Sequence, residues 1–215
     1  VVLVTALAAW IAAARLSAQA PQEIKVLQVT PNVYMLVGDG GNVTVQVEPP
    51  AAAARPPRIP GNYRGADGVL VVDSGLTANA EKLRAAIRQI SRGPLRYIIN
   101  THIHPDHMGG NETLGKPMPG ERPAPSPTIL SHENMLLQLA TPEGNEARLP
   151  TGMIPTDAYL DLKELWFNGE SIQVFHIPNA HTDADSIVYF RRSDVISAGD
   201  IYTTTSYPLL RSEEH

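Results

Sequence analysis

A strand–helix–strand unit near the middle of the chain restricts its possible folds more than any other feature. Residues 68–73 (GVLVVD) are continuously apolar until a polar turn, as expected of a strand buried on both faces. Thr77 can cap the helix that follows. The apolar side chains of that helix recur three or four residues apart at Leu83, Ala86, Ile87 and Ile90. Gly93 and Pro94 end the helix, and residues 95–100 form the next strand, so this order predicts α/β layering.

Shorter runs of β-branched and aromatic residues on either side of this unit predict further strands. They cover residues 23–30, 33–37, 42–48, 128–130, 162–167, 171–177, 186–190 and 195–198. Asn168 and Gly169 separate two of these runs and favour a two-residue hairpin turn. A short helix is expected over residues 133–140, and the Pro-rich residues 49–68 and 115–127 are interpreted as surface insertions. The pattern therefore predicts one mixed α/β domain.

Composition excludes several kinds of chemistry. The chain has no cysteine, which rules out disulfides, thiolate metal ligands, a cysteine nucleophile and iron–sulfur ligation. With 17 basic and 22 acidic residues, the formal net charge is −5, so we expect no nucleic-acid partner. Hydrophobic residues make up 43% of the chain, enough for a packed core.

The N-terminal residues have the features of an export signal. Residues 1–14 are almost entirely apolar, and Ala18-Gln19-Ala20 supplies the small-x-small pattern of a cleavage site. The apolar run is too short to span a bilayer comfortably, and Arg15 interrupts it. We therefore expect a signal peptide at residues 1–20, a folded domain at residues 21–215, a periplasmic or secreted location, and no stable membrane anchor.

A cluster of metal-ligand side chains directly follows the strand at residues 95–100. His102, His104, Asp106 and His107 lie within six residues. Alternate residues of an extended segment point to the same side, so His102 and His104 can bind one metal ion. Pro105 forces a turn that can bring Asp106 and His107 to a second position nearby. Imidazole and carboxylate ligands suit zinc, and also iron or manganese.

The sequence HIHPDH at residues 102–107 resembles the signature of the metallo-β-lactamase superfamily. Three other motifs agree with that family in their order along the chain: VVDSG at 71–75, AHTD at 180–183 and AGD at 198–200. The resemblance extends over residues 23–205 apart from the two Pro-rich insertions. It implies an αββα four-layer sandwich with a metal site at one edge of two facing sheets.

The resemblance also implies a role for each motif residue. The first metal ion would be held by His102, His104 and His181. The second would be held by Asp106 and His107, and Asp200 would bridge the pair. Asp106 would also orient the attacking water and pass a proton to the leaving group, while Asp73 would orient a histidine rather than bind metal.

The chain departs from the family pattern near its C-terminus. The second metal ion of the family normally has one more histidine ligand, several tens of residues beyond the position of Asp200. The chain ends fifteen residues after Asp200, and His215 is the sole candidate there. We therefore expect a chain incomplete at both ends that keeps every ligand of the first metal, with two zinc ions in the complete protein.

Other polar residues have ordinary structural interpretations. His132 is expected to cap or pack at a helix start, and His176 to lie in the core or beside a ligand. Asp183 and Asp185 are expected to form hydrogen bonds in the loop around His181. Met108 and residues 149–159 are weaker candidates for lining a substrate cleft. Tyr202 resembles the tyrosine that lactonases of the family carry after the bridging aspartate, but it lies one position too close to Asp200.

These features predict a secreted zinc-dependent hydrolase that acts on a small molecule through an activated water. Its target would be an ester, lactone, thioester or β-lactam type bond. Two alternatives stay open: an enzyme resembling the iron persulfide dioxygenases of the family, with one iron on His102, His104, His181 and Asp200, and a metal-binding fragment without activity. The substrate and the oligomeric state are not specified by the sequence.

Overall fold

The computed structural model describes residues 23–50, 67–117, 125–140 and 149–204. The expected signal peptide, most of both Pro-rich insertions and His215 lie outside these ranges. Within them, no helix is long and apolar enough to cross a membrane.

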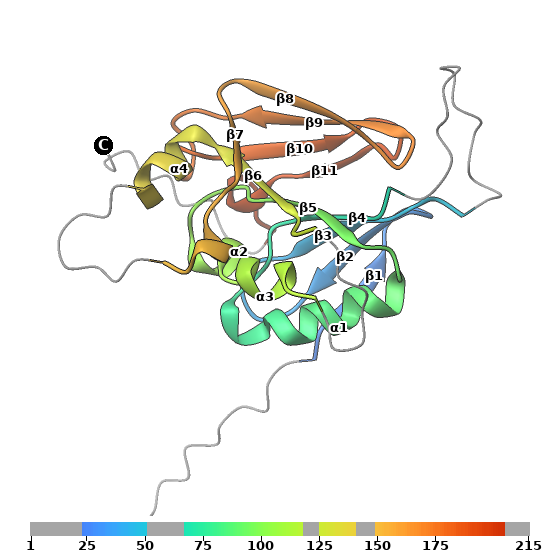
Figure 1. Cartoon of the computed structure of the whole chain (residues 1–215). Coiled ribbons are helices and arrows are strands. Elements are labelled where there is room, and N and C mark those ends of the chain that lie inside the picture. Colours follow the sequence, from blue (N-terminus) through green and yellow to red (C-terminus); the bar gives the residue numbers. More distant parts are fainter. Residues whose placement is uncertain (1–22, 51–66, 118–124, 141–148, 205–215) are drawn as a thin grey trace, which may run out of the picture.

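A seven-stranded sheet forms the centre of the molecule (Figure 1), and its strands follow one another in chain order. The strands are β1 (Lys25–Gln28), β2 (Val33–Val37), β3 (Val43–Gln46), β4 (Val69–Val72), β5 (Leu95–Ile99), β6 (Thr128–His132) and β7 (Asp157–Tyr159). The pairs from β1 to β4 are antiparallel, and those from β4 to β7 are parallel. The parallel half is the part that brings several strand ends to one edge.

A four-stranded antiparallel sheet of order β11-β10-β9-β8 faces the first sheet. Its strands are β8 (Leu162–Phe167), β9 (Glu170–His176), β10 (Ser186–Phe190) and β11 (Val195–Ser197). Asn168 (φ 47°) and Gly169 (φ 80°) form the β8–β9 turn. Positive φ at both positions is the type I′ geometry expected of Asn-Gly, because it matches the twist of the flanking strands.

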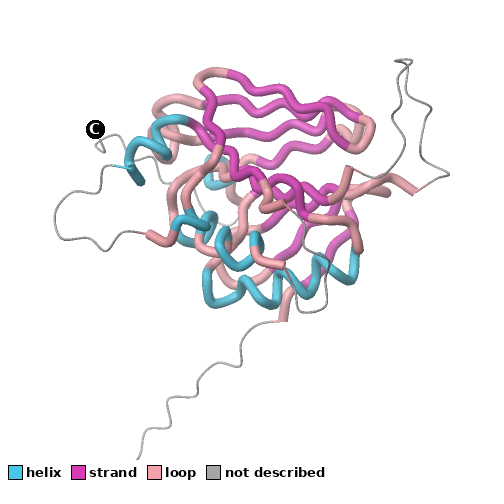
Figure 2. The backbone as a smooth tube through the Cα atoms, in the orientation of Figure 1, coloured by secondary structure: helices cyan, strands magenta, loops and turns pink. Residues whose placement is uncertain are grey.

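The helices cover the far face of the seven-stranded sheet and one of its ends (Figure 2). The α-helices are α1 (Ala80–Ile90), α2 (Pro105–Met108), α3 (Asn111–Gly115) and α4 (Glu133–Ala140). Short 3₁₀ turns are η1 (Thr77–Asn79), η2 (Thr151–Met153) and η3 (Gly199–Ile201). The spacing of Leu83, Ala86 and Ile87 places them together in the core beneath α1.

Strand β4 shows how the layers are held together. Val69 and Val71 pack under α1, while Leu70 and Val72 pack against the second sheet, because successive side chains of a strand point to opposite faces. All four are fully buried, which explains the uninterrupted apolar sequence. The described residues thus build three layers of the expected sandwich: helices, sheet and sheet. None of their helices covers the outer face of β8–β11.

Two local expectations differ from the structure. Thr77 does not cap α1; it begins η1, and its hydroxyl donates a hydrogen bond to the carbonyl of Gly109 at 2.8 Å. Strand β7 was not predicted, because its three residues are too short to show a period and pair only through the distant strand β6. The other predicted strands and helices are present, with ends shifted by up to three residues.

A buried carboxylate joins the two sheets at the end where the β8–β9 turn lies. Glu170 is 2% exposed. Its Oε1 accepts hydrogen bonds from Asn32 Nδ2 (3.2 Å), Gln46 Nε2 (3.1 Å) and Ser193 Oγ (2.7 Å). Its Oε2 accepts bonds from the backbone N–H groups of Arg192 and Ser193, both at 3.0 Å. One side chain therefore satisfies donors from both sheets.

Replacing Glu170 should destabilise the fold strongly. Glu170→Ala leaves several buried donors without acceptors, so we expect a loss of about 3 kcal/mol or more in the free energy of unfolding, measured by urea denaturation. The matched control is Glu164→Ala on the neighbouring strand, where the side chain is exposed and the change should stay within about 0.5 kcal/mol. Equal effects of the two substitutions would contradict this role.

Candidate metal centre

The candidate site lies at the carboxyl ends of β4 and β5. Asp73 directly follows β4, and Asn100 and Thr101 directly follow β5. The two chain segments are joined at that point, since the backbone N–H of Asp73 donates to the carbonyl of Ile99 at 2.8 Å. Polar loops meet where parallel strands end, which is the usual place for a functional site in such sheets.

The segment after β5 turns sharply at Pro105, as predicted. Pro105 is the first residue of α2, where its missing N–H costs no helical hydrogen bond. His102 and His104 lie just before the turn, and His102 Nε2 and His104 Nδ1 are 3.0 Å apart. Asp106 and His107 lie within the helix and face the same region.

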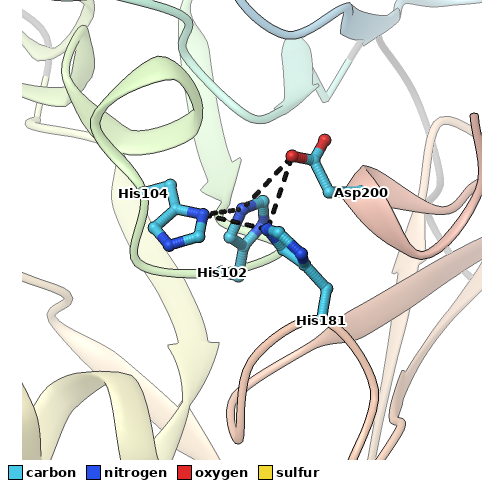
Figure 3. A group of neighbouring side chains, drawn as sticks. All are labelled: His102, His104, His181 and Asp200. Carbon is cyan, nitrogen blue, oxygen red and sulfur yellow. Dashed lines mark hydrogen bonds and ion pairs between the residues drawn. The ribbon is translucent and has the colours of Figure 1, made fainter. Parts of the chain in front are cut away.

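Two other segments bring side chains to the same place (Figure 3). His181 lies in the loop between β9 and β10, and its Nε2 is 3.0 Å from His104 Nδ1. Asp200 lies in η3, directly after β11; its Oδ2 is 3.9 Å from His102 Nε2 and 3.5 Å from His181 Nε2. Both segments belong to the second sheet, so the site spans the two sheets.

The ligand-type atoms form two groups that share Asp200. One consists of His102, His104, His181 and Asp200, and the other of Asp106, His107 and Asp200. In each group the candidate atoms lie within 4.8 Å of one another. His107 Nε2 is 3.0 Å from Asp200 Oδ1 and 3.7 Å from Asp106 Oδ2. The structure therefore brings together all six residues expected to hold metal, in the two sets that the motifs indicated.

The donor atoms suit a cation. Burial, together with the neighbouring His107, lowers the pKa of His102 to about 2, so its imidazole is neutral and can offer a lone pair. His107 Nε2 is buried and makes no hydrogen bond to any described residue, although Asp200 lies close to it. Imidazole nitrogens and carboxylate oxygens that converge in this way are the ligand set expected for zinc, iron or manganese.

Asp73 contacts the His107 ring at its Nδ1 atom. Its Oδ2 is 2.8 Å from His107 Nδ1, and its two carboxylate oxygens accept bonds from the backbone N–H and the hydroxyl of Thr101, both at 2.8 Å. Burial by itself lowers the pKa of His107, but Asp73 and Asp200 outweigh it and raise the pKa to about 10. The His107 ring in turn holds the pKa of Asp200 at about 2. Asp73 thus contacts a histidine, as expected, and is in neither candidate ligand group.

Sequence reasoning missed the buried amides that support the turn. Asn100 and Asn111 are both fully buried and pair through their side chains, at 2.8 Å and 3.1 Å. Ser74 Oγ donates to Asn111 Oδ1 at 2.8 Å and to the carbonyl of His107 at 3.1 Å. The two asparagines flank the histidine motif in the sequence, which was the one available signal.

Gly41 was also missed. A Cβ atom at this position would lie 2.7 Å from His107 Cε1 and 2.8 Å from His107 Nε2, so the β2–β3 loop can approach the ring only because residue 41 has no side chain. Nothing in the sequence around Gly41 indicates a neighbour 66 residues away.

The remaining candidates have the structural contacts expected of them. His132 is buried, and its Nδ1 accepts a hydrogen bond from the backbone N–H of Asn134 in the first turn of α4. His176 Nε2 donates a hydrogen bond to the carbonyl of Asp183, in the loop of His181, at 3.0 Å. Asp185 accepts a hydrogen bond from the backbone N–H of Thr182. Met108 is buried, and Tyr202 is 71% exposed.

Comparison with known proteins agrees with this geometry. The sequence pattern described as the metallo-beta-lactamase superfamily matches residues 63–212. The chain belongs to the metallo-beta-lactamase superfamily. Members of this superfamily are generally hydrolases and bind metal ions, often zinc.

Among curated proteins, the chain is 21% identical over 174 residues to a linear primary-alkylsulfatase of Pseudomonas sp. (strain ATCC 19151). That alignment covers 66% of this chain and 33% of the alkylsulfatase. An uncharacterised protein, YobT, of Bacillus subtilis (strain 168) is 28% identical over 138 residues, covering 62% of this chain and 57% of that protein. The chain thus spans between a third and about half of the length of these relatives.

Solved structures show the same fold at low identity. A metallo-beta-lactamase of Cronobacter sakazakii with a HARLDQ motif superposes with a TM-score of 0.62 at 19% identity, covering 90% of this chain and 68% of that one. The FEZ-1 metallo-beta-lactamase of Legionella gormanii superposes with a TM-score of 0.57 at 13% identity, covering 79% and 59%.

Gly41→Ala should disturb the group of Asp106, His107 and Asp200 selectively. The added Cβ would push the His107 ring, so we expect weaker cobalt binding at this group and unchanged binding at the group with three histidines, followed by visible absorption during titration. Gly115→Ala is the control, because its Cβ would meet only Pro127 at an ordinary 3.7 Å. Identical titrations of both variants and the wild type would show that the His107 ring does not need this space.

Proposed function

We propose that this protein is a zinc-dependent hydrolase of small molecules containing an ester, lactone, thioester or β-lactam type bond. The observation that carries the proposal is the convergence of six ligand-type side chains into two groups that share Asp200. The neutral state of His102 supports metal at the group with three histidines. The convergence of His107 Nε2 with carboxylate oxygens of Asp106 and Asp200 supports metal at the other group. Family membership supports hydrolysis as the reaction class.

In this proposal His102, His104, His181 and Asp200 would hold one ion, and Asp106, His107 and Asp200 would hold the other. Divalent cations held by these residues would supply a water of lowered pKa and would polarise the oxygen of the bond to be cleaved. Asp73 fixes the orientation of His107 through the 2.8 Å contact to Nδ1, leaving Nε2 turned toward the site. These contacts keep the ligand geometry in place before any substrate arrives.

Asp106 is the residue we assign to proton transfer. Its side chain is 38% exposed, unlike that of His107, so a substrate and a water molecule can reach it. As the water attacks, its proton passes to the Asp106 carboxylate; as the bond breaks, the same proton goes to the leaving group. Asp106 therefore both accepts the proton and returns it, so the step needs no second proton-transfer residue.

The substrate and the location of the protein are further parts of the proposal. The alkylsulfatase relative adds sulfate monoesters to the bonds worth testing. The apolar leader at residues 1–14 and the Ala18-Gln19-Ala20 pattern support an extracytoplasmic location, where the substrate would be a small molecule from the environment.

Metal analysis combined with a hydrolysis screen tests the function. We expect the purified chain to retain zinc after dialysis, to hydrolyse at least one member of a panel of these bonds, to lose activity with a chelator, and to recover it with added zinc. His104→Ala should remove metal from the group with three histidines together with activity, and Glu164→Ala should leave both unchanged. Retained zinc stoichiometry in His104→Ala would refute the ligand assignment. One equivalent of iron instead of zinc would favour persulfide oxidation.

Substitution of Asp106 tests the proton-transfer step, and metal content per chain shows whether the ion held with His107 and Asp200 is lost at the same time. Asp106→Asn keeps the size of the side chain but removes the base, so we expect kcat to fall by about 10² to 10⁴. Metal at the group with His102, His104 and His181 should stay bound, as measured by metal content per chain. An unchanged kcat would contradict this role of Asp106.

A further inference from the structure

His181 lies in a loop whose position must be fixed relative to His102 and His104. The loop runs from residue 177 to residue 185 between two strands of the second sheet, whereas His102 and His104 come from the first sheet. Its ends are fixed by backbone bonds: Ile177 N–H donates to the Asp185 carbonyl at 2.8 Å, and Ser186 N–H donates to the Thr101 carbonyl at 2.9 Å. His181 lies between these ends, so its position depends on what holds the middle of the loop.

The middle of the loop is held at one backbone carbonyl. The Asp183 carbonyl oxygen accepts a hydrogen bond from Asn134 Nδ2 at 2.9 Å, and His176 Nε2 lies 3.0 Å from the same oxygen. A carbonyl can only accept, so the His176 proton is on Nε2. The two donors come from different elements, α4 and the end of β9. They meet at an atom two residues from His181.

His132 fixes both of these donors. Its ring stacks on the His176 ring with centroids 3.6 Å apart and planes 16° from parallel. Its Nδ1 accepts a hydrogen bond from the backbone N–H of Asn134 at 3.2 Å. Burial and the neighbouring His176 lower the pKa of His132, which keeps the Nδ1 lone pair available for that bond. His132 therefore holds the ring of one donor and the backbone of the other.

An apolar contact links the same helix to the two ligand segments. Met135, next to Asn134 on α4, is fully buried in a cluster with Met108 and Ala184. Met108 directly follows His107, and Ala184 directly follows Asp183. The start of α4 thus packs between the segment of the histidine motif and the loop of His181.

We propose that His132, Asn134 and His176 are positioning residues that fix His181 for metal binding through the Asp183 carbonyl. This inference rests on the proposed function, because it assumes that His181 binds metal. It goes further by assigning a role to three residues that belong to neither ligand group.

Two substitutions remove the donors while keeping the shape of the side chains. Asn134→Asp keeps the size and suits the first turn of a helix, but it places an acceptor against the Asp183 carbonyl. His176→Phe keeps a ring for stacking on His132 but has no N–H. His176→Gln can place an amide donor near the former Nε2 and serves as the conservative rescue. Gln138→Ala is the matched control, because Gln138 donates to the side-chain carboxylate of Asp183 and not to its carbonyl.

The measurement is the affinity for zinc, by competition with a chromophoric chelator, together with the visible spectrum of the cobalt-loaded protein. We expect Asn134→Asp and His176→Phe to weaken the tightest metal equivalent about 10- to 100-fold and to alter the cobalt spectrum, the range usual for residues that orient ligands. His176→Gln should recover most of the affinity, and Gln138→Ala should match the wild type. Thermal unfolding of each apoprotein distinguishes weaker metal binding from loss of fold. If His176→Phe does not fold, the result for Asn134→Asp alone tests the positioning role.

The outcomes distinguish this inference from the function on which it rests. Wild-type protein that binds no zinc would overturn the proposed function and this assignment with it. Wild-type protein that binds zinc, with Asn134→Asp and His176→Phe binding equally tightly and giving the same cobalt spectrum, would overturn the positioning role alone.

Discussion

The carboxylate of Asp73 connects the parts on which the candidate metal centre depends. It follows β4, accepts two hydrogen bonds from Thr101 at the end of β5, and contacts His107 in α2. The Asp73 side chain is only 2% exposed, so its hydrogen bonds form away from water. Hydrogen bonds are stronger in such a setting, and a buried group left without one would destabilise the fold. Because β4 and β5 are parallel neighbours, this one side chain fixes the relative position of two strand ends and of one histidine ring.

The two-sheet core makes this arrangement possible. Leu70 and Val72 on β4 pack against the second sheet, which supplies His181 and Asp200. A packed interior resists small displacements, so ligands from opposite sheets can be held a few ångströms apart. At the far end, the bonds of Glu170 join the same two sheets. The site is thus held at one edge of a sandwich that is stabilised both by apolar packing and by a buried polar network.

Different kinds of interaction fix the ligands on different sides of the candidate metal centre. His107 is oriented by a carboxylate, while the turn that carries it is supported by the paired amides of Asn100 and Asn111. The loop of His181 is instead fixed at a carbonyl near two donors that His132 contacts. A carboxylate therefore supports one side of the site, while an imidazole and an amide donor support the other. Such a division leaves the ligand nitrogens turned inward, as a metal centre requires.

The sequence by itself determined the local structure and the list of candidate ligands. Periodicity and turn residues predicted α1, the Asn-Gly hairpin and nearly all strands, and the motifs named the six residues that the structure brings together. It could not show strand β7, the failure of Thr77 to cap a helix, or the approach of Gly41 to His107, because each depends on segments distant in the chain. Only the tertiary structure decided which histidine Asp73 contacts and that His132 stacks on His176. The first contact arises when β4 and β5 pair within one sheet, and the second when the two sheets pack together.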